Sequence, residues 1–391
     1  MASSDANPSR PLRILAVVEW YPPAYKAGGP VRSVQNLMQL LKAQTPHHLE
    51  VVCGNRDLGS AEPLAGISSD TPTDQDGIAV TYRSTVSYAW WKAKLRGTPA
   101  APPPDVIYLN SLFSVPYALQ PLRAAKSLGI RVVLAPRGML GAGALAIKPA
   151  KKKLFLTLAR LFGLFRGVRW HASTPVEVIE IQRQFPRAEC RVAINVPLFQ
   201  AESQKPKLDG GCSFLVLGRI NQKKNIHLAL EALQKVDLEG KGLTVELVGP
   251  AEDQPYLERL LSMARPGLRM VHVGAVHPDS LGQVWARCHA LLMPTRHENF
   301  GHAVVEAWAH GRPVMLSDQT PWRGLAELDL GWDLPLDVDV WAAHLSKALS
   351  WEQGDWERMF DACQKKHASI VGDPRLVSDN RLVFEAPFEA R

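Results

Sequence analysis

Apolar runs alternate with amphipathic stretches along the first half of the chain. The first run, LRILAVVEW (residues 12–20), is typical of a buried β-strand, and residues 31–44 after it carry apolar side chains at helical spacing. Pro30 suits the first turn of that helix, because its missing N–H would lack a partner there anyway. Six more β-type runs follow, at HLEVVCG, GIAVTYRS, DVIYLNS, RVVLAP, GVRWHAS and CRVAINV. Strands that alternate with helices predict a mostly parallel sheet that is covered on both faces.

The same pattern restarts in the second half. Residues 201–211 are polar and typical of a linker, and CSFLVLGRI after them is a new buried strand. We therefore expect an α/β protein with two doubly wound Rossmann-like domains, residues 1–200 and 201–371, that face each other across a cleft. A tail of residues 372–391 is expected to pack back on the first domain. Ligands of open α/β sheets bind at the carboxyl ends of the strands, so the cleft is the expected site.

Composition and charge narrow the class of protein. The five cysteines are scattered among 391 residues, which predicts reduced thiols and no structural zinc. The N-terminus lacks the apolar segment of a secretion signal. The longest apolar run, residues 154–165, is shorter than the about 20 residues that a helix needs to span a bilayer. We therefore expect a cytoplasmic protein. Residues 1–200 carry a net charge of +12 and the remainder −5, which indicates either an anionic partner for the first half or a field that only maintains solubility.

The strongest motif is HALLMPTRHENFGHAVVEAWAHGRPVMLSD (residues 289–318), which predicts strand, loop, helix, turn and strand. The helix is expected from about Gly301 to His310, with free N–H groups at its start. Such a helix end carries partial positive charge and binds phosphate oxygens, and a glycine lets a diphosphate approach the backbone. The predicted contacts of a diphosphate-containing ligand are Asn299, Phe300, Gly301, His302 and Glu306.

Two carboxylates flank this helix start. Glu298 lies just before the helix and Glu306 lies in its second turn. Carboxylates beside a diphosphate would repel it, so we interpret them as ligands of hydroxyl groups, one on a sugar and one on a ribose. The alternative stays open that Glu298 complements the helix dipole and that Glu306 is a surface residue.

Cations and glycines follow two other predicted strands. Arg219 ends a buried strand and Lys224 precedes the next helix, so both are expected at the cleft, where they could neutralise a leaving diphosphate. The alternative is two exposed loop cations. Gly28 and Gly29 lie after the first strand and before a helix, where a backbone can also approach an anion.

Together these segments resemble glycosyltransferase family 4. The resemblance is carried by GRINQKKN, by H-E-N-F-G with a second glutamate after seven intervening residues, and by the early AGGP loop. It implies the GT-B fold and retention of anomeric configuration. It also implies that Arg219 and Lys224 hold the donor diphosphate, that Glu298 holds donor sugar hydroxyls, that Glu306 holds the ribose and that Gly29 lies near the phosphates. The segments LAPRGML, KPAKKKLF and WHASTPVE look like bacterial polysaccharide-assembly members of the family.

One position departs from the family pattern. Many members carry a histidine where this chain has Asn110, and an amide cannot titrate, so a general base at that position is in doubt. His171 and His302 are alternative hydroxyl contacts, or ordinary partly buried histidines. We assign Asn110, Arg137 and His171 to the acceptor side.

Two further motifs are discounted. Asp74-Gln75-Asp76 spells the metal motif of another transferase fold, but its setting, TPTDQDG, is typical of a turn. Residues 141–146 match G-x-G-x-x-A, a dinucleotide fingerprint, but do not directly follow a strand and lack the acid that should come about 20 residues later.

The expected reaction is transfer of a sugar from a nucleotide-sugar donor to a glycan or lipid-linked acceptor, in cell-surface or exopolysaccharide synthesis. We assign catalysis to Glu298, Arg219 and Lys224, and expect no metal, no other cofactor and no nucleic-acid partner. Three alternatives stay open: a nucleotide-sugar 2-epimerase-type isomerase, an NAD-dependent oxidoreductase and a catalytically idle anion-binding module.

Residues 148–166 (KPAKKKLFLTLARLFGLFR) combine six basic residues with large apolar side chains. One interpretation is an interfacial helix, which would place the protein peripherally on the anionic inner face of the cell membrane. The other is that the apolar face packs on the first sheet and the lysines are solvated.

Overall fold

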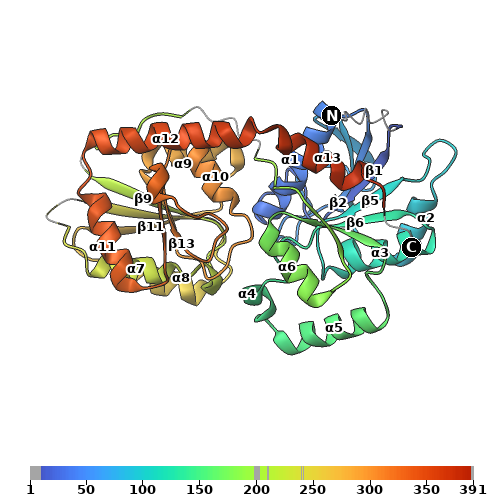
Figure 1. Cartoon of the computed structure of the whole chain (residues 1–391), viewed down its shortest axis with the longest axis horizontal. Helices are drawn as coiled ribbons and strands as arrows, with labels where there is room; N and C mark the ends of the chain where they lie inside the picture. Colours follow the sequence, from blue (N-terminus) through green and yellow to red (C-terminus); the bar gives the residue numbers. More distant parts are fainter. Residues whose placement is uncertain (1–9, 198–202, 209–210, 239, 241, 389–391) are drawn as a thin grey trace, which may run out of the picture. The chain divides into compact units, whose positions relative to one another are not determined.

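The chain divides into two units, which we describe from a computed structural model (Figure 1). The first unit comprises Met1–Val196 and Pro374–Arg391, and the second comprises Pro197–Asp373. The structure describes residues 10–197, 203–208, 211–238, 240 and 242–388.

The first unit contains an eight-stranded sheet in the order β3-β4-β2-β1-β5-β6-β7-β8. All neighbouring strands are parallel except β3 and β4, which are antiparallel. The strands are β1 Arg13–Val17, β2 His48–Gly54, β3 Pro72–Gln75, β4 Ile78–Arg83, β5 Val106–Leu109, β6 Arg131–Leu134, β7 Val168–Ala172 and β8 Glu189–Val192. The helices are α1 Gly29–Gln44, α2 Tyr88–Arg96, α3 Gln120–Ser127, α4 Ala142–Leu145, α5 Pro149–Leu161, α6 Pro175–Gln184 and α13 Pro374–Glu385, with a π-helical turn at Val115–Leu119.

Helices cover both faces of this sheet. Successive strand residues point to opposite faces, so Ile14 and Ala16 pack with α1 and α13, while Leu15 and Val17 pack with α2, α3, α5 and α6. Strands that are apolar on both faces explain why the sequence shows continuous apolar runs rather than alternation.

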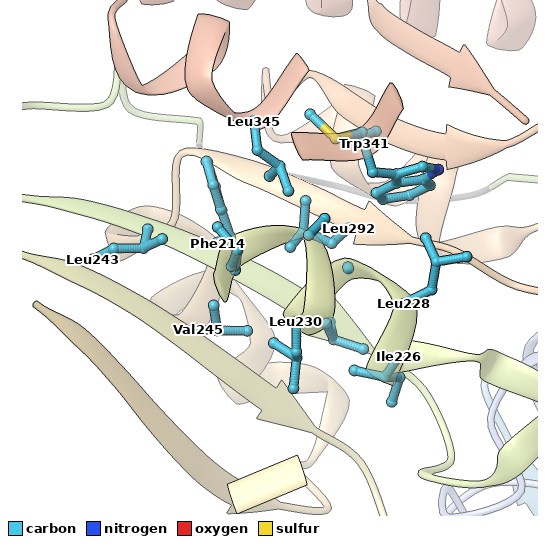
Figure 2. Packing of buried hydrophobic residues seen from close by; sticks show 14 of the residues in the cluster. Phe214, Ile226, Leu228, Leu230, Leu243, Val245, Leu292, Trp341 and Leu345 are labelled. Carbon is cyan, nitrogen blue, oxygen red and sulfur yellow. The ribbon is translucent and has the colours of Figure 1, made fainter. Parts of the chain in front are cut away.

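The second unit contains a six-stranded parallel sheet in the order β11-β10-β9-β12-β13-β14. The strands are β9 Cys212–Leu217, β10 Leu243–Val248, β11 Leu268–Gly274, β12 Ala290–Met293, β13 Val314–Ser317 and β14 Gly331–Leu334. The helices are α7 Ile226–Gln234, α8 Gln254–Leu261, α9 Leu281–Arg287, α10 His302–Ala309, α11 Val338–Leu349 and α12 Gln353–Val371, with short 3-10 turns at Gln222–Lys224, Pro278–Ser280 and Ala326–Leu328. Figure 2 shows strand residues such as Phe214 and Leu292 packed against Leu230 of α7 and Trp341 of α11. The prediction of two doubly wound α/β units is confirmed.

Each sheet has one point where the strand order reverses. In the first unit the chain runs from β1 outward through β2 and then returns to β5 on the other side of β1. In the second unit it runs from β9 through β10 and β11 and then returns to β12 on the other side of β9. In the first sheet, the loops after β1 and β5 therefore turn to opposite faces and leave room for a ligand between the two loops. In the second sheet, the loops after β9 and β12 do the same.

A buried arginine anchors the last helix to the first unit. Arg169 on β7 has no exposed surface, and its Nε donates to Glu189 Oε1 at 2.6 Å. Its Nη1 donates to the carbonyl oxygens of Val383, at 3.2 Å, and Ala386, at 2.9 Å. These carbonyls lie at the end of α13, where a cation is favoured by the helix dipole.

We expect Arg169→Met to lower the free energy of unfolding by about 2 to 4 kcal/mol, because the substitution leaves buried carbonyl groups and Glu189 without their charged donor. Denaturant unfolding and limited proteolysis of the C-terminal helix measure the effect. Arg191→Met, at an exposed arginine on the neighbouring strand β8, is the matched control and should change stability by less than about 0.5 kcal/mol. Equal stability of the two variants would contradict the assignment of Arg169 as the anchor.

Candidate functional site

The loops after β9 and β12 are tied together at the reversal point of the second sheet. The backbone N–H of Arg296 and the hydroxyl of Thr295 both donate to the carbonyl oxygen of Lys223, at 3.1 Å and 3.3 Å. Beside these bonds, Lys224 Nζ lies 2.8 Å from Glu298 Oε2. The structure thus brings together two of the predicted site residues that are 74 positions apart in the chain.

Glu298 is an ionised carboxylate at neutral pH, because its pKa is strongly lowered. Burial by itself would raise the pKa of its carboxyl, but the ammonium of Lys224, the charge of Lys223 and the backbone N–H of Asn299 lower that pKa to about 2. The Asn299 N–H donates to Glu298 Oε1 at 3.2 Å. About a fifth of the Glu298 side chain stays exposed, so a ligand hydroxyl can still reach a carboxylate oxygen. At neutral pH this group can accept hydrogen bonds but is too weak a base to take up a proton.

The N-F-G turn leads into α10, and no side chain caps the start of this helix at Gly301. Gly301 caps α10 with φ +83°, in the left-handed region, and a Cβ there would lie 3.1 Å from Val304 Cγ2 and 3.4 Å from Glu298 Cγ. Phe300 is buried, and its ring centroid lies 5.1 Å from that of His302. Since the first N–H groups of a helix have no acceptors within it, this end of α10 can bind an anion.

Trp322 holds this turn in place, although no motif in the sequence points to it. Its indole N–H donates to the carbonyl oxygen of Phe300 at 2.6 Å, and its ring packs edge-on against Trp308 of α10. The residue lies in the loop after β13, the next strand of the sheet. A packing role of this kind depends on tertiary contacts and leaves no local pattern.

Glu306 lies inside the unit rather than on its surface. It is 4% exposed, and its Oε1 accepts a hydrogen bond from Trp285 Nε1 of α9 at 3.2 Å. The alternative interpretation of Glu306 as a surface residue is therefore wrong. Its contact with a ribose stays a prediction.

Arg219 is held at the end of β9 by an acid that sequence reasoning missed. Its Nη1 lies 2.7 Å from Glu252 Oε1, and Asn221 Nδ2 donates to Glu252 Oε2 at 2.6 Å. The Arg219 side chain is 45% exposed, so it is positioned without being enclosed. Arg219 and Lys224 therefore each have a carboxylate partner. The alternative of two exposed loop cations fits Arg219, which is exposed, but not Lys224, whose side chain is 24% exposed.

A second set of predicted residues meets at the reversal point of the first sheet. The carboxylate of Asp57 accepts the N–H groups of Tyr25 and Lys26, each at 3.1 Å, and so fixes the loop that leads to Gly28. Gly28 has φ +70° and caps α1, which begins at Gly29. Asn110, after β5, donates from Nδ2 to the carbonyl oxygen of Pro30 at 3.3 Å. The glycine loop and Asn110 are thus neighbours.

A chain of hydrogen bonds runs inward from Asn110. Arg137 Nε donates to Asn110 Oδ1 at 2.8 Å, and Arg137 Nη2 donates to the hydroxyl of Tyr108 at 2.5 Å. That hydroxyl lies 3.0 Å from His171 Nδ1, and His171 Nε2 lies 2.9 Å from the carbonyl oxygen of Ala193. Since a carbonyl only accepts, the proton of the imidazole is on Nε2, and Tyr108 donates to Nδ1.

His171 supports the site from inside. It is 1% exposed, and burial, followed by the nearby charge of Arg137, lowers its pKa to about 3, so the ring is neutral. Both ring nitrogens are occupied, so His171 acts through Tyr108 and Arg137 and offers no direct hydroxyl contact to an acceptor. Of the three acceptor-side predictions, Asn110 and Arg137 lie at the strand ends.

The discounted aspartates form a turn. Asp76 and Gly77 both have positive φ between the antiparallel strands β3 and β4, and Gly77 N–H donates to Asp74 Oδ1 at 2.8 Å. This is the geometry of a tight two-residue hairpin, and the turn interpretation is confirmed.

Comparisons with known families assign both halves of the chain. Residues 211–350 match the family described as "Glycosyl transferases group 1", and residues 28–195 match the "Glycosyl transferase 4-like domain". An uncharacterized glycosyltransferase of Methanocaldococcus jannaschii is 26% identical over 144 residues, 36% of each chain. The 2-deoxystreptamine glucosyltransferase of Streptomyces kanamyceticus is 30% identical over 106 residues, 27% of each chain. The matched segment thus spans about a third of the length of these curated relatives.

Solved structures match over nearly the whole chain. Anabaena HepE in complex with UDP and glucose superposes with a TM-score of 0.67 at 16% identity and covers 95% of this chain and 98% of its own. Sucrose-phosphate synthase from Thermosynechococcus elongatus gives a TM-score of 0.68 at 14% identity, with the same coverage. At these identities the likeness concerns the fold, and with the two family matches it shows that the chain belongs to the group 1 glycosyltransferases of the GT-B fold.

Proposed function

We propose that this protein transfers a sugar, with retention of configuration, from a nucleotide-sugar donor to a glycan or lipid-linked acceptor in cell-surface or exopolysaccharide synthesis. The observation that carries the proposal is the Lys224–Glu298 pair beside the N-terminus of α10, at the reversal point of the second sheet. The structural neighbour HepE was solved with UDP-glucose, which supports a nucleotide-sugar donor.

Each part of the site suits one part of the donor. The N–H groups at the start of α10, together with Lys224 and the half-exposed Arg219, fit a diphosphate, because all of them carry positive charge. Glu298 fits the sugar hydroxyls, which can donate to its ionised oxygens. The buried Glu306, oriented by Trp285, is left for the ribose.

The chemistry is the front-face transfer that the family resemblance implies, and the weak basicity of Glu298 agrees with it. During transfer the bond between the anomeric carbon and the phosphate oxygen breaks, and the acceptor oxygen bonds to the same face of the sugar. The acceptor proton passes to the departing phosphate oxygen, so no protein base is required. The cations and helix N–H groups stabilise the negative charge that develops on the diphosphate, which lowers the barrier.

The first unit supplies the acceptor side in this proposal. Asn110 and Arg137 lie beside the Gly28–Gly29 loop and offer an amide and a guanidinium to an incoming hydroxyl or anionic group. The buried chain through Tyr108 and His171 holds the guanidinium in one orientation.

A panel of UDP-, GDP- and ADP-sugars tests the proposal. We expect one class of donor to raise the melting temperature, because ligands stabilise by mass action, and to release its nucleoside diphosphate when an acceptor is added. Release should survive EDTA, since cationic side chains and helix N–H groups take the place of a metal. Conversion of the donor without any acceptor would identify an isomerase instead, and an absorbance change of NAD would identify an oxidoreductase. Loss of activity in EDTA, with recovery when a divalent ion is added, would contradict the metal-independent mechanism.

Glu298→Gln should reduce kcat while donor binding survives. The amide keeps the shape of the side chain but loses the charge-assisted hydrogen bond to the sugar, at a cost of roughly 2–4 kcal/mol in the transition state. Because the pKa of about 2 keeps Glu298 ionised, the pH profile of the residual activity should keep its wild-type shape. Glu327→Gln, at an exposed acid of the same unit, is the control. Near-normal kcat of folded Glu298→Gln would remove Glu298 from the catalytic machinery.

Arg219→Ala and Lys224→Ala should each lose most of kcat/KM, and the double variant should lose less than the product of the two effects. Both cations are proposed to act on one diphosphate, and groups that act as a unit do not add. Arg259→Ala removes an exposed ion pair with Glu231 in the same unit and should change little. Strictly additive losses would mean that the two cations serve separate sites.

A further inference from the structure

The outer face of α5 exposes large apolar side chains. Phe155, Leu156 and Ala159 of α5 pack into the core of the first unit, but the leucines on the opposite side of the helix do not. Leu161 is 73% exposed and Phe162 is 77% exposed. The exposed apolar side chains of this surface, which we call the α5 face, are Ile147, Leu154, Leu158, Leu161 and Phe162. Figure 1 shows α5 at the margin of its unit, next to α4.

These residues form a stripe with cations on both sides. Leu154, Leu158 and Leu161 follow the i, i+4, i+7 spacing of a single helical face. Lys153 and Arg160, seven residues apart, flank one side of the stripe, and Lys151 flanks the other. Lys148 and Arg166, also exposed, extend the basic region beyond the two ends of the helix.

The inner face of α5 shows that this exposure is not a consequence of poor packing. Lys152 turns inward, where its Nζ donates to the carbonyl oxygen of Ala144 at 2.5 Å and lies 5.3 Å from the ring centroid of Phe113. One face of α5 therefore packs against the first unit, and the exposed apolar stripe lies on the opposite face of the helix. The packing interpretation of residues 148–166 therefore holds for the inner face of α5, and the interfacial interpretation stays a prediction for the stripe.

The charged residues around the α5 face are all basic. Residues 142–168 contain six Lys or Arg and no Asp or Glu. We propose that the α5 face docks on the surface of an anionic lipid bilayer, with the leucines and Phe162 among the acyl chains and the cations at the lipid phosphates. Cations that border an apolar stripe match the layered chemistry of a bilayer surface. Each basic residue at such a surface strengthens binding about fivefold, so the cations of this face together suffice for localisation.

The proposal is that α5 docks on the surface of a bilayer and does not cross it. Among the described residues, no helix is both long and apolar enough to cross a membrane. Helix α5 begins twelve residues after Arg137, so it follows closely on the segment assigned to the acceptor. If the proposed function holds, a lipid-linked acceptor would be met at the surface where this face binds.

Co-sedimentation with vesicles tests the docking without any substrate. We expect the protein to bind phosphatidylcholine vesicles that contain phosphatidylglycerol, to bind pure phosphatidylcholine weakly, and to be released by salt. Lys151→Glu/Lys153→Glu/Arg160→Glu should weaken binding at least tenfold. Leu154→Gln/Leu158→Gln/Leu161→Gln should do the same while keeping every charge, which a purely electrostatic attraction would not predict.

A matched control is Lys42→Glu/Arg56→Glu/Arg96→Glu, which makes the same charge change at exposed positions of the same unit outside the α5 face. It should bind vesicles within about twofold of wild type. All three variants should keep the wild-type melting temperature and the thermal shift with the donor, so a failure of docking is distinguishable from a failure of the proposed function.

Absence of binding to anionic vesicles at low salt would overturn the proposal, as would binding that neither α5 variant weakens. If the control variant weakens vesicle binding as much as the α5 variants do, the binding depends on the net charge of the protein and not on the α5 face. That result would also overturn the proposal. If sedimentation velocity instead shows a dimer that the leucine variant dissociates, and vesicles do not bind, the face is a protein interface.

Discussion

The ion pair between Lys224 and Glu298 joins the loops that leave two neighbouring parallel strands. In a parallel sheet covered on both faces, polar side chains can meet a ligand only at the carboxyl ends of the strands, and the widest opening lies where the strand order reverses. The pair lies at that point in the second unit, with the start of α10 beside it. Loss of either partner would leave a poorly solvated charge, so the pair holds the site together before any ligand arrives.

The two units present different charges at their reversal points. In the second unit each predicted cation has a carboxylate partner, Glu252 or Glu298, that fixes its orientation. In the first unit the hydrogen bonds of Arg137 within the described chain go to neutral groups, namely Asn110, Asn195 and Tyr108. Under the proposed function this charge would meet an anionic or hydroxylic acceptor, which agrees with the basic excess of the first half of the sequence.

Much of this arrangement could be predicted because it is local in sequence. Strands that are apolar on both faces produce runs such as LRILAVVEW, and the N-F-G turn marks the start of α10. What the sequence could not indicate depends on contacts between distant segments: Trp322 on the Phe300 carbonyl, Trp285 on Glu306, and the burial of His171. The short edge strand β3 was missed because it is polar and pairs only with β4.

The central claim is that the donor diphosphate binds where Lys224, Glu298 and the start of α10 meet. The most direct measurement is a crystal structure of the protein with the nucleoside diphosphate of its preferred donor. The account predicts phosphate oxygens within hydrogen-bond distance of the Lys224 ammonium and of the backbone N–H groups at Gly301 and His302, with the Glu298 carboxylate facing the vacant sugar position. A diphosphate bound away from α10, with the Lys224–Glu298 pair untouched, would contradict it.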